Sequence, residues 1–204
     1  MPRITLYEHA PTRSARCRWT LLEAGLDFDS VGNPSDFIDS EEFAAIHPLR
    51  KLPAAVIDGR ALFESAAIST VVADLVPERE LVAKPGTWAR ALHDQWVSFA
   101  LTEMEPWLWS SEINSVEILM PKEQQVPAIV PQNNELFRRS AAVLDAALDR
   151  TDYLIENRFT VTDIIVGYTV SWGESDGLLH GFENLGAYLD RLRTREHCTL
   201  PRPG

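Results

Sequence analysis

The stretch from Lys51 to Ile68 constrains the fold more than any other part of this chain. It opens with Lys51-Leu52-Pro53-Ala54, a proline-kinked start to a strand, and continues to Asp58-Gly59, which lies between apolar flanks. Because Asp-Gly is a strong signal for a tight hairpin turn, the flanks predict two antiparallel strands. Glu64-Ser65 then opens an apolar helix, and the amino-terminal end of a helix attracts carboxylates. The segment therefore predicts strand, turn, strand and helix, with an anion site at the helix start.

The beginning of the chain predicts a strand, a helix and a second strand. Arg3–Tyr7 and Leu26–Val31 alternate apolar and polar residues, and the Ser14–Ala24 stretch between them has a helical apolar stripe followed by Gly25, a suitable C′ residue. A right-handed crossover through this helix makes the two strands parallel. With a short helix expected around Glu41–Ile46, the order becomes βαβ-ββα. We therefore expect an α/β half with a four-stranded mixed sheet.

The rest of the chain predicts helices only. We place a first domain at residues 1–77, a charged and proline-containing linker at 78–85, and an all-helical domain at 86–204. Apolar periodicity indicates long helices over Thr87–Trp109 and Asn133–Leu148, and a last helix over Asn184–Thr194. The inward positions expected for the first two are Trp88, Leu92, Trp96, Phe99 and Leu108, then Leu136, Val143, Leu144 and Ala147.

A sharper helix signal lies at residues 159–164. Thr160 and Asp163 fit a capping box, in which each side chain binds the other residue's backbone amide, and Phe159 and Ile164 fit the hydrophobic staple that accompanies it. A buried helix over Ile164–Trp172 is expected to follow.

Composition excludes several classes of function. The chain has 204 residues and a formal net charge of −11, which disfavours nucleic acid and anionic membranes as partners. The two cysteines, Cys17 and Cys198, indicate no disulfide framework, and we expect a cytoplasmic protein without signal peptide or membrane span. His9 and His93 have no metal-ligand spacing, so no metal is expected.

Four motifs together resemble the cytosolic glutathione transferases, over nearly the whole chain. The first is Leu6-Tyr7 followed by residues 13–25, RSARCRWTLLEAG; the second is residues 47–54, HPLRKLPA; the third is residues 63–68, FESAAI; the fourth is the capping box. The resemblance implies a thioredoxin-like N-terminal domain that binds glutathione, an all-helical C-terminal domain, and a homodimer.

The resemblance also implies glutathione-binding residues. The bond before Pro53 is cis in the family, which would turn the Leu52 backbone toward the cysteinyl peptide of glutathione. Ser65 is expected to bind the γ-glutamyl carboxylate, Glu64 the amino group, and Lys51 the glycyl carboxylate. The loop departs from the family at two residues, since His47 replaces a frequent Asn and Arg50 a frequent Gly.

The resemblance places the thiol-activating group in the loop before the first helix. A hydroxyl donor and a helix amino terminus lower the pKa of a thiol from its free value near 8.5. Thr12 is our first candidate and Ser14 the second, with Arg13 adding positive charge, so we expect the serine/threonine or cysteine branch. Two alternatives are the strand residue Tyr7 and the helical thiol of Cys17, which more often only packs.

The function expected from these residues is glutathione transfer to a hydrophobic electrophile, a reaction used in detoxification. Trp96, Trp107 and Trp109 are candidates for an aromatic electrophile pocket, although helical spacing of this kind also suits a core. The alternatives are a non-catalytic binding or interaction protein of the same fold, and a glutathione-dependent lyase, isomerase, dehalogenase or disulfide reductase.

Overall fold

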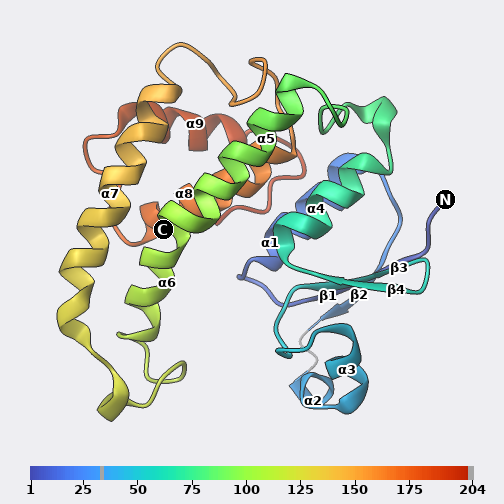
Figure 1. The fold of residues 1–204 in the computed structure, drawn as a ribbon, viewed down its shortest axis with the longest axis horizontal. Helices are drawn as coiled ribbons and strands as arrows, with labels where there is room; N and C mark the ends of the chain where they lie inside the picture. The colour runs from blue at the N-terminus through green and yellow to red at the C-terminus, as the bar shows by residue number, and fades with distance from the viewer. Residues whose placement is uncertain (33–34, 202–204) are drawn as a thin grey trace.

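The computed structural model describes residues 1–32 and 35–201, which form a half built on a sheet and a half built of helices (Figure 1). The first half contains β1 Ile4–Glu8, α1 Ser14–Ala24, β2 Asp29–Gly32, α2 Ser35–Ile38, α3 Glu41–Ile46, β3 Ala54–Ile57, β4 Arg60–Phe63 and α4 Ser65–Asp74. The 3-10 helix η1 Pro77–Arg79 follows. The second half contains α5 Trp88–Phe99, the π-helical turn η2 Ala100–Met104, α6 Glu105–Ile113, η3 Lys122–Gln124, η4 Pro127–Ile129, α7 Val130–Ala147, α8 Val161–Ser175 and α9 Glu183–Arg193.

The sheet has the strand order β2-β1-β3-β4, with β1 parallel to β2 and antiparallel to β3. Helices α1 and α4 lie on one side of it, and α2 and α3 lie on the other (Figure 1). The mixed four-stranded sheet and the βαβ-ββα order are confirmed. The second strand begins at Asp29 rather than at Leu26, because the Leu26 amide still donates to the Leu21 carbonyl at 3.2 Å to close α1. The short helix α2 was not among the predicted elements.

The turn residues behave as their types predict. Asp58 and Gly59 both have positive φ, 48° and 77°, as a hairpin turn of the I′ kind requires, and an Asp58 carboxylate oxygen accepts from the Arg3 amide at 2.9 Å. Gly25 ends α1 in the left-handed conformation with φ 65°. The hairpin turn and the end of α1 therefore lie where the sequence predicts them.

The helix predicted over Thr87–Trp109 is divided. Thr87 caps α5 by accepting from the Arg90 amide at 3.2 Å, and the turn at Ala100–Met104 widens to a π-helix just before Glu105 and Pro106. Pro106 has no amide to donate and its ring crowds the preceding turn, which is a recognised cause of such breaks. The helix therefore changes course at Glu105.

Two residues predicted to face inward are exposed instead. Trp88, the first residue of α5, is 79% exposed, and Val143 is 52% exposed. The buried stripe of α7 is Phe137, Ala141 and Leu144, which continues to Leu148 beyond the helix end. These buried positions have helical spacing, and Val143 lies on the side of α7 that faces away from them. The prediction that Val143 faces the core was therefore wrong.

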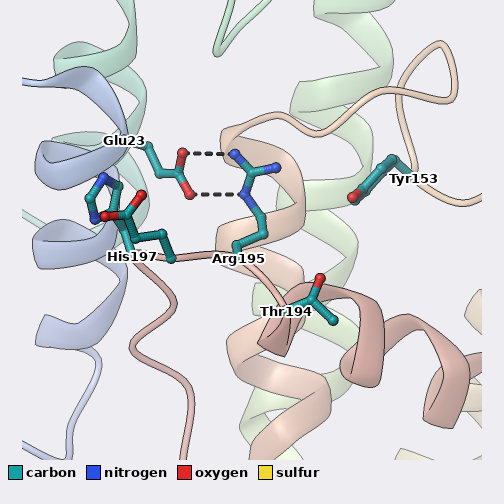
Figure 2. Close-up of a pocket in the computed structure, with 6 residues that line it drawn as sticks. Glu23, Tyr153, Thr194, Arg195 and His197 are labelled. Atoms are coloured by element: carbon teal, nitrogen blue, oxygen red, sulfur yellow. Dashed lines mark hydrogen bonds and ion pairs between the residues drawn. The ribbon is translucent and has the colours of Figure 1, made fainter.

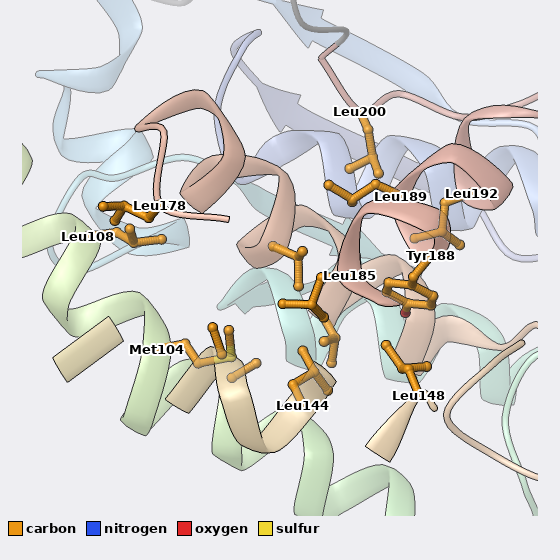
Figure 3. Close-up of a cluster of buried hydrophobic side chains, with 14 of the residues drawn as sticks. Met104, Leu108, Leu144, Leu148, Leu178, Leu185, Tyr188, Leu189, Leu192 and Leu200 are labelled. Atoms are coloured by element: carbon orange, nitrogen blue, oxygen red, sulfur yellow. The ribbon is translucent and has the colours of Figure 1, made fainter. Parts of the chain in front are cut away.

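The core of the helical half gathers around α8 and α9. Figure 3 shows Leu185, Tyr188, Leu189 and Leu192 of α9 pointing into it. The predicted capping box is present, and the Thr160 amide donates to Asp163 Oδ2 at 2.8 Å. Helix α8 begins at Val161 and runs to Ser175, beyond the predicted end. Within the described residues, no helix combines the length and the apolar character needed to cross a bilayer.

His93 joins the two halves through a buried polar contact. Its Nδ1 lies 2.8 Å from Thr162 Oγ1 on α8, and its Nε2 lies 3.2 Å from Thr70 Oγ1 on α4. The ring is 2% exposed, and burial lowers the pKa of His93 to about 4, with a smaller contribution from Arg90. The imidazole is therefore neutral at physiological pH.

We predict that His93 makes the protein less stable as the pH falls. The unfolded chain binds a proton near pH 6.5 and the folded chain near 4, so stability declines across that window, by about 2 kcal/mol between pH 6.5 and 5. Urea unfolding of the wild type and of His93→Asn at pH 7 and pH 5 measures this. Burial also raises the pKa of Asp163 to about 6, but that group titrates in both proteins. The difference in unfolding free energy between the wild type and His93→Asn should therefore be smaller at pH 5 than at pH 7. An equal difference at both pH values would refute the assignment.

Candidate functional site

The two hydroxyls predicted to act on a thiol lie in one loop between β1 and α1. Ser14 Oγ is buried and accepts from the His9 amide at 3.1 Å. Thr12 is partly exposed, and its Oγ1 donates to the His9 carbonyl, accepts from the Ser14 amide at 3.2 Å and lies 2.9 Å from Ser14 Oγ. Ser14 thus braces the loop. Thr12 is the hydroxyl that a ligand could contact, provided that its proton turns from the His9 carbonyl toward that ligand.

Arg13 points toward the helical half rather than standing free beside the loop. Its Nε donates to Glu105, and its guanidinium lies 5.3 Å from the ring centroid of Trp109 and 4.9 Å from that of Trp172. Glu105 neutralises part of its charge. Arg13 therefore belongs to the wall between the halves, and its effect on a thiol is weaker than that of an unpaired arginine.

The loop before β3 has the predicted cis bond between Leu52 and Pro53, and Pro53 is buried. Lys51 is exposed and, among the described residues, forms no hydrogen bond or ion pair. A second cis bond, Ala10-Pro11, lies in the loop that carries Thr12 and had not been anticipated.

The two departures from the family pattern are built into this loop. His47 is buried, with its ring 4.8 Å from that of Phe63, and its Nδ1 accepts from the Leu49 amide at 3.1 Å. Burial lowers the pKa of His47. Arg50 turns away to bind Glu41 at 2.7 Å. In this structure, both residues therefore stabilise the loop through contacts of their own.

The corner between β4 and α4 has the geometry of an anion site. Glu64 is exposed and has φ 72°, a conformation that costs an ordinary residue on the order of 1–3 kcal/mol and is typical of ligand-binding corners. Ser65 follows as the first residue of α4, where the first amides have no acceptor within the helix. Its hydroxyl oxygen accepts from Arg16 Nη1 at 3.2 Å. Among the described residues, the Ser65 hydroxyl donates to none, so its proton is available to a ligand.

A buried arginine and a buried glutamate next to this corner escaped the sequence analysis. Arg16 is 1% exposed, and its Nη2 donates to Glu105 Oε2 at 2.8 Å and to Thr169 Oγ1 at 2.7 Å. Burial alone would raise the pKa of Glu105, but Arg16 and then Arg13 outweigh it and hold that pKa below its usual range. The only available sequence signal was Pro106, which marks a helix break beside Glu105.

The two alternative thiol-activating residues lie elsewhere. Cys17 is fully buried, and burial raises its pKa to about 12, so it is a protonated packing residue whose Sγ donates to the Ser65 carbonyl at 3.6 Å. Tyr7 stacks on Phe37 with ring centroids 5.7 Å apart and lies 5.6 Å from Phe43, within the α2 and α3 side of the sheet. Both contacts favour structural roles.

Two clefts lie away from these residues. One, of about 350 Å³, is lined by Glu23, Tyr153, Thr194, Arg195, Glu196 and His197, and Figure 2 shows Arg195 binding both oxygens of Glu23. Glu23 is in the last turn of α1, about 13 Å along the helix from Ser14. The other, of about 310 Å³, includes Trp107. Of the three tryptophans predicted to line an electrophile pocket, only Trp109 lies beside Arg13. Trp96 packs edge-on against Phe99.

Comparison with solved structures shows a shared fold over nearly the whole chain. The glutathione S-transferase from Xylella fastidiosa matches with a TM-score of 0.83 at 21% identity, covering 96% of this chain and 95% of that one. The glutathione transferase URE2P6 from Phanerochaete chrysosporium, solved in complex with oxidized glutathione, gives 0.82 at 22% identity, covering 96% and 93%.

Sequence comparison shows similarity to the glutathione S-transferases. Residues 2–73 match the family model of the glutathione S-transferase N-terminal domain. Glutathione S-transferase GstA of Escherichia coli O157:H7 is 25% identical over 183 residues, which is 86% of each chain. Residues 2–73 thus match the N-terminal domain of the glutathione S-transferases, and the relatives that extend over the rest of the chain carry the same family name. The relatives support a glutathione transferase that uses glutathione as co-substrate, and they do not favour the alternative activities or the non-catalytic role. In the part of the chain that the structure describes, no group of three or more His, Cys, Asp or Glu residues could hold a metal ion.

Proposed function

We propose that this glutathione S-transferase binds glutathione between the Leu52-Pro53 corner and the start of α4, and that Thr12 activates the thiol. The observation that supports this most is the corner at Glu64 and Ser65. It combines an unused hydroxyl proton, the free amides of a helix start and an exposed carboxylate in a strained conformation. Glutathione offers the complementary groups, a carboxylate and an ammonium on the same carbon.

The remaining parts of the tripeptide have partners within the same face. Ser65 and the first amides of α4 would bind the γ-glutamyl carboxylate, and Glu64 would bind the ammonium. The backbone of Leu52 would pair with the cysteinyl peptide. Lys51, exposed and unpaired in the described chain, would reach the glycyl carboxylate.

The thiol is proposed to lie at Thr12. This hydroxyl is partly exposed at the start of α1, whereas that of Ser14 is buried in bonds to the loop. The Thr12 proton, which points to the His9 carbonyl, would turn to the sulfur, and this hydrogen bond and the positive end of the helix dipole would both favour the thiolate. This assignment would place the protein in the serine/threonine branch of the family.

The electrophile is proposed to be a hydrophobic small molecule received near Trp109 and Trp172, where the halves meet. We further propose that the chain works as a cytoplasmic homodimer in detoxification, with the division at residues 1–77, 78–85 and 86–204 given above. We propose no metal, membrane or nucleic acid as a partner.

The test of this function is retention of the protein on immobilised glutathione together with turnover of 1-chloro-2,4-dinitrobenzene. Retention without turnover of this or any related electrophile would favour a binding protein instead.

Ser65→Ala is predicted to weaken glutathione binding more than turnover. It removes a hydroxyl bond to a charged acceptor, so we expect the dissociation constant of glutathione to rise about tenfold or more. Ser69 offers a matched control, because it is buried one turn further along α4 and its hydroxyl interacts with the Cys17 thiol rather than with Arg16. Calorimetric titration should show Ser69→Ala binding like the wild type. Equal affinity in Ser65→Ala would remove Ser65 from the anion site.

A further inference from the structure

Glu105 lies where the helical half meets the glutathione-binding half, and no sequence motif marks it as part of the site. It begins α6, directly after the π-helical turn Ala100–Met104. Single π-turns within α-helices are frequent at functional sites, because they redirect the side chains that follow. Glu105 is 4% exposed, and its carboxylate binds both Arg13, which directly precedes α1, and Arg16 of α1.

The guanidinium of Arg16 is held on all of its edges. Nε donates to the Ile165 carbonyl at 3.1 Å, Nη2 binds Glu105 Oε2 and Thr169 Oγ1, and Nη1 lies 3.5 Å from Glu105 Oε1. Because a guanidinium is planar and rigid, fixing three nitrogens fixes the direction of every N–H bond. The remaining direction of Nη1 leads to Ser65 Oγ at 3.2 Å.

That contact determines what Ser65 can do. A hydroxyl has one proton and two lone pairs, and Arg16 occupies one lone pair. The proton is thereby directed away from Arg16, and in the described structure it meets no acceptor. Ser65 is prepared as a donor toward the place where the γ-glutamyl carboxylate would bind.

We propose that Glu105 is a positioning residue for glutathione: it fixes Arg16, and Arg16 orients the Ser65 hydroxyl toward the γ-glutamyl carboxylate. This inference rests on the proposed function, since it requires glutathione to occupy the start of α4. Glu105 does not touch the ligand. Through Glu105, the helical half influences how tightly the N-terminal half binds the γ-glutamyl carboxylate.

Charge and positioning make opposite predictions for Glu105→Gln. The substitution removes a negative charge near a site for an anion, so an effect of charge alone would tighten glutathione binding. Loss of positioning would weaken it. We expect the dissociation constant of glutathione to rise about fivefold to tenfold, within the range of a weakened bond to a charged group.

The decisive measurement compares two ligands by calorimetry: glutathione and γ-aminobutyryl-cysteinyl-glycine, which lacks only the γ-glutamyl α-carboxylate. Removing that carboxylate should cost the wild type about 30-fold in affinity and Glu105→Gln about fivefold or less. Glu23→Gln is the matched control, because Glu23 binds Arg195 through two contacts of 2.8 Å between the same two halves, away from the start of α4. It should keep the full 30-fold discrimination.

Because Glu105→Gln leaves Arg16 buried without its anion, a second variant guards against misfolding. Thr169→Val removes one hydrogen-bond partner of Arg16 without changing the charge or shape of the side chain. The loss of affinity on removing the carboxylate should then be about threefold smaller than the 30-fold loss in the wild type. Full discrimination in Thr169→Val and in any folded Glu105→Gln would overturn the inference. A wild type that binds neither ligand would overturn the proposed function itself. That result differs from full discrimination in the variants, which would overturn only the role of Glu105.

Discussion

Replacing Thr12 by alanine is expected to lower kcat with 1-chloro-2,4-dinitrobenzene about a hundredfold. Removing a single preorganised donor to a developing or bound anion typically costs on the order of a hundredfold or more in rate. In the proposed site the anion is the thiolate of glutathione, whose free thiol is mostly protonated at neutral pH. Steady-state kinetics at saturating glutathione measures the effect directly.

The pH profile of Thr12→Ala separates a lost donor from a distorted loop. If Thr12 stabilises the thiolate, the variant needs a higher pH to ionise bound glutathione, and its kcat should rise across the alkaline range where the wild type is already level. Thr12→Ser keeps a hydroxyl at the same place and should retain the wild-type profile, with kcat within about threefold. An alanine variant with the wild-type profile would contradict the assignment.

Ser14→Ala provides the complementary control. The Ser14 hydroxyl accepts from the His9 amide and is buried, so its loss should lower thermal stability more than it changes the pH profile. Unchanged turnover in Thr12→Ala together with loss in Ser14→Ala would move the thiol-activating role to Ser14.

Gly173→Ala is predicted to destabilise the fold by about 3 kcal/mol. An added Cβ would lie 2.2 Å, 2.6 Å and 3.1 Å from three ring atoms of Phe137, which is fully buried between α7 and α8. The ring cannot withdraw without displacing the helical core, so one of the helices must shift. Urea unfolding gives the free-energy change.

Gly186 is the matched glycine for this experiment. It lies within α9, and an added Cβ there meets no atom within 4 Å. Gly186→Ala should stabilise by up to about 1 kcal/mol, because alanine is the better helix former. Equal effects of the two substitutions would mean that the close packing of α8 on Phe137 is not what decides stability there.

Local signals explain which parts of the fold could be predicted from the sequence. Gly25 and Asp58-Gly59 act through their own backbone preferences, so the end of α1 and the hairpin were predicted correctly. The capping box depends on residues three apart and was equally predictable. Val143 failed because periodicity gives the spacing of a stripe but not which neighbouring stripe meets the core.

The candidate site divides in the same way. Motifs placed Leu52-Pro53 and Glu64-Ser65, and the structure brings them to the ends of adjoining elements. Glu105 could not be found from the sequence, because its partner Arg16 lies 89 residues away. A charged residue in an amphipathic helix usually faces solvent, and only packing of the two halves reveals that this one is buried.

Calorimetric titration of the purified wild type with millimolar glutathione tests the central claim most directly. We expect saturable heat that Ser65→Ala weakens and Ser69→Ala leaves unchanged, with S-hexylglutathione competing for the same site. No heat and no competition at these concentrations would contradict glutathione binding at the Leu52-Pro53 corner and the start of α4.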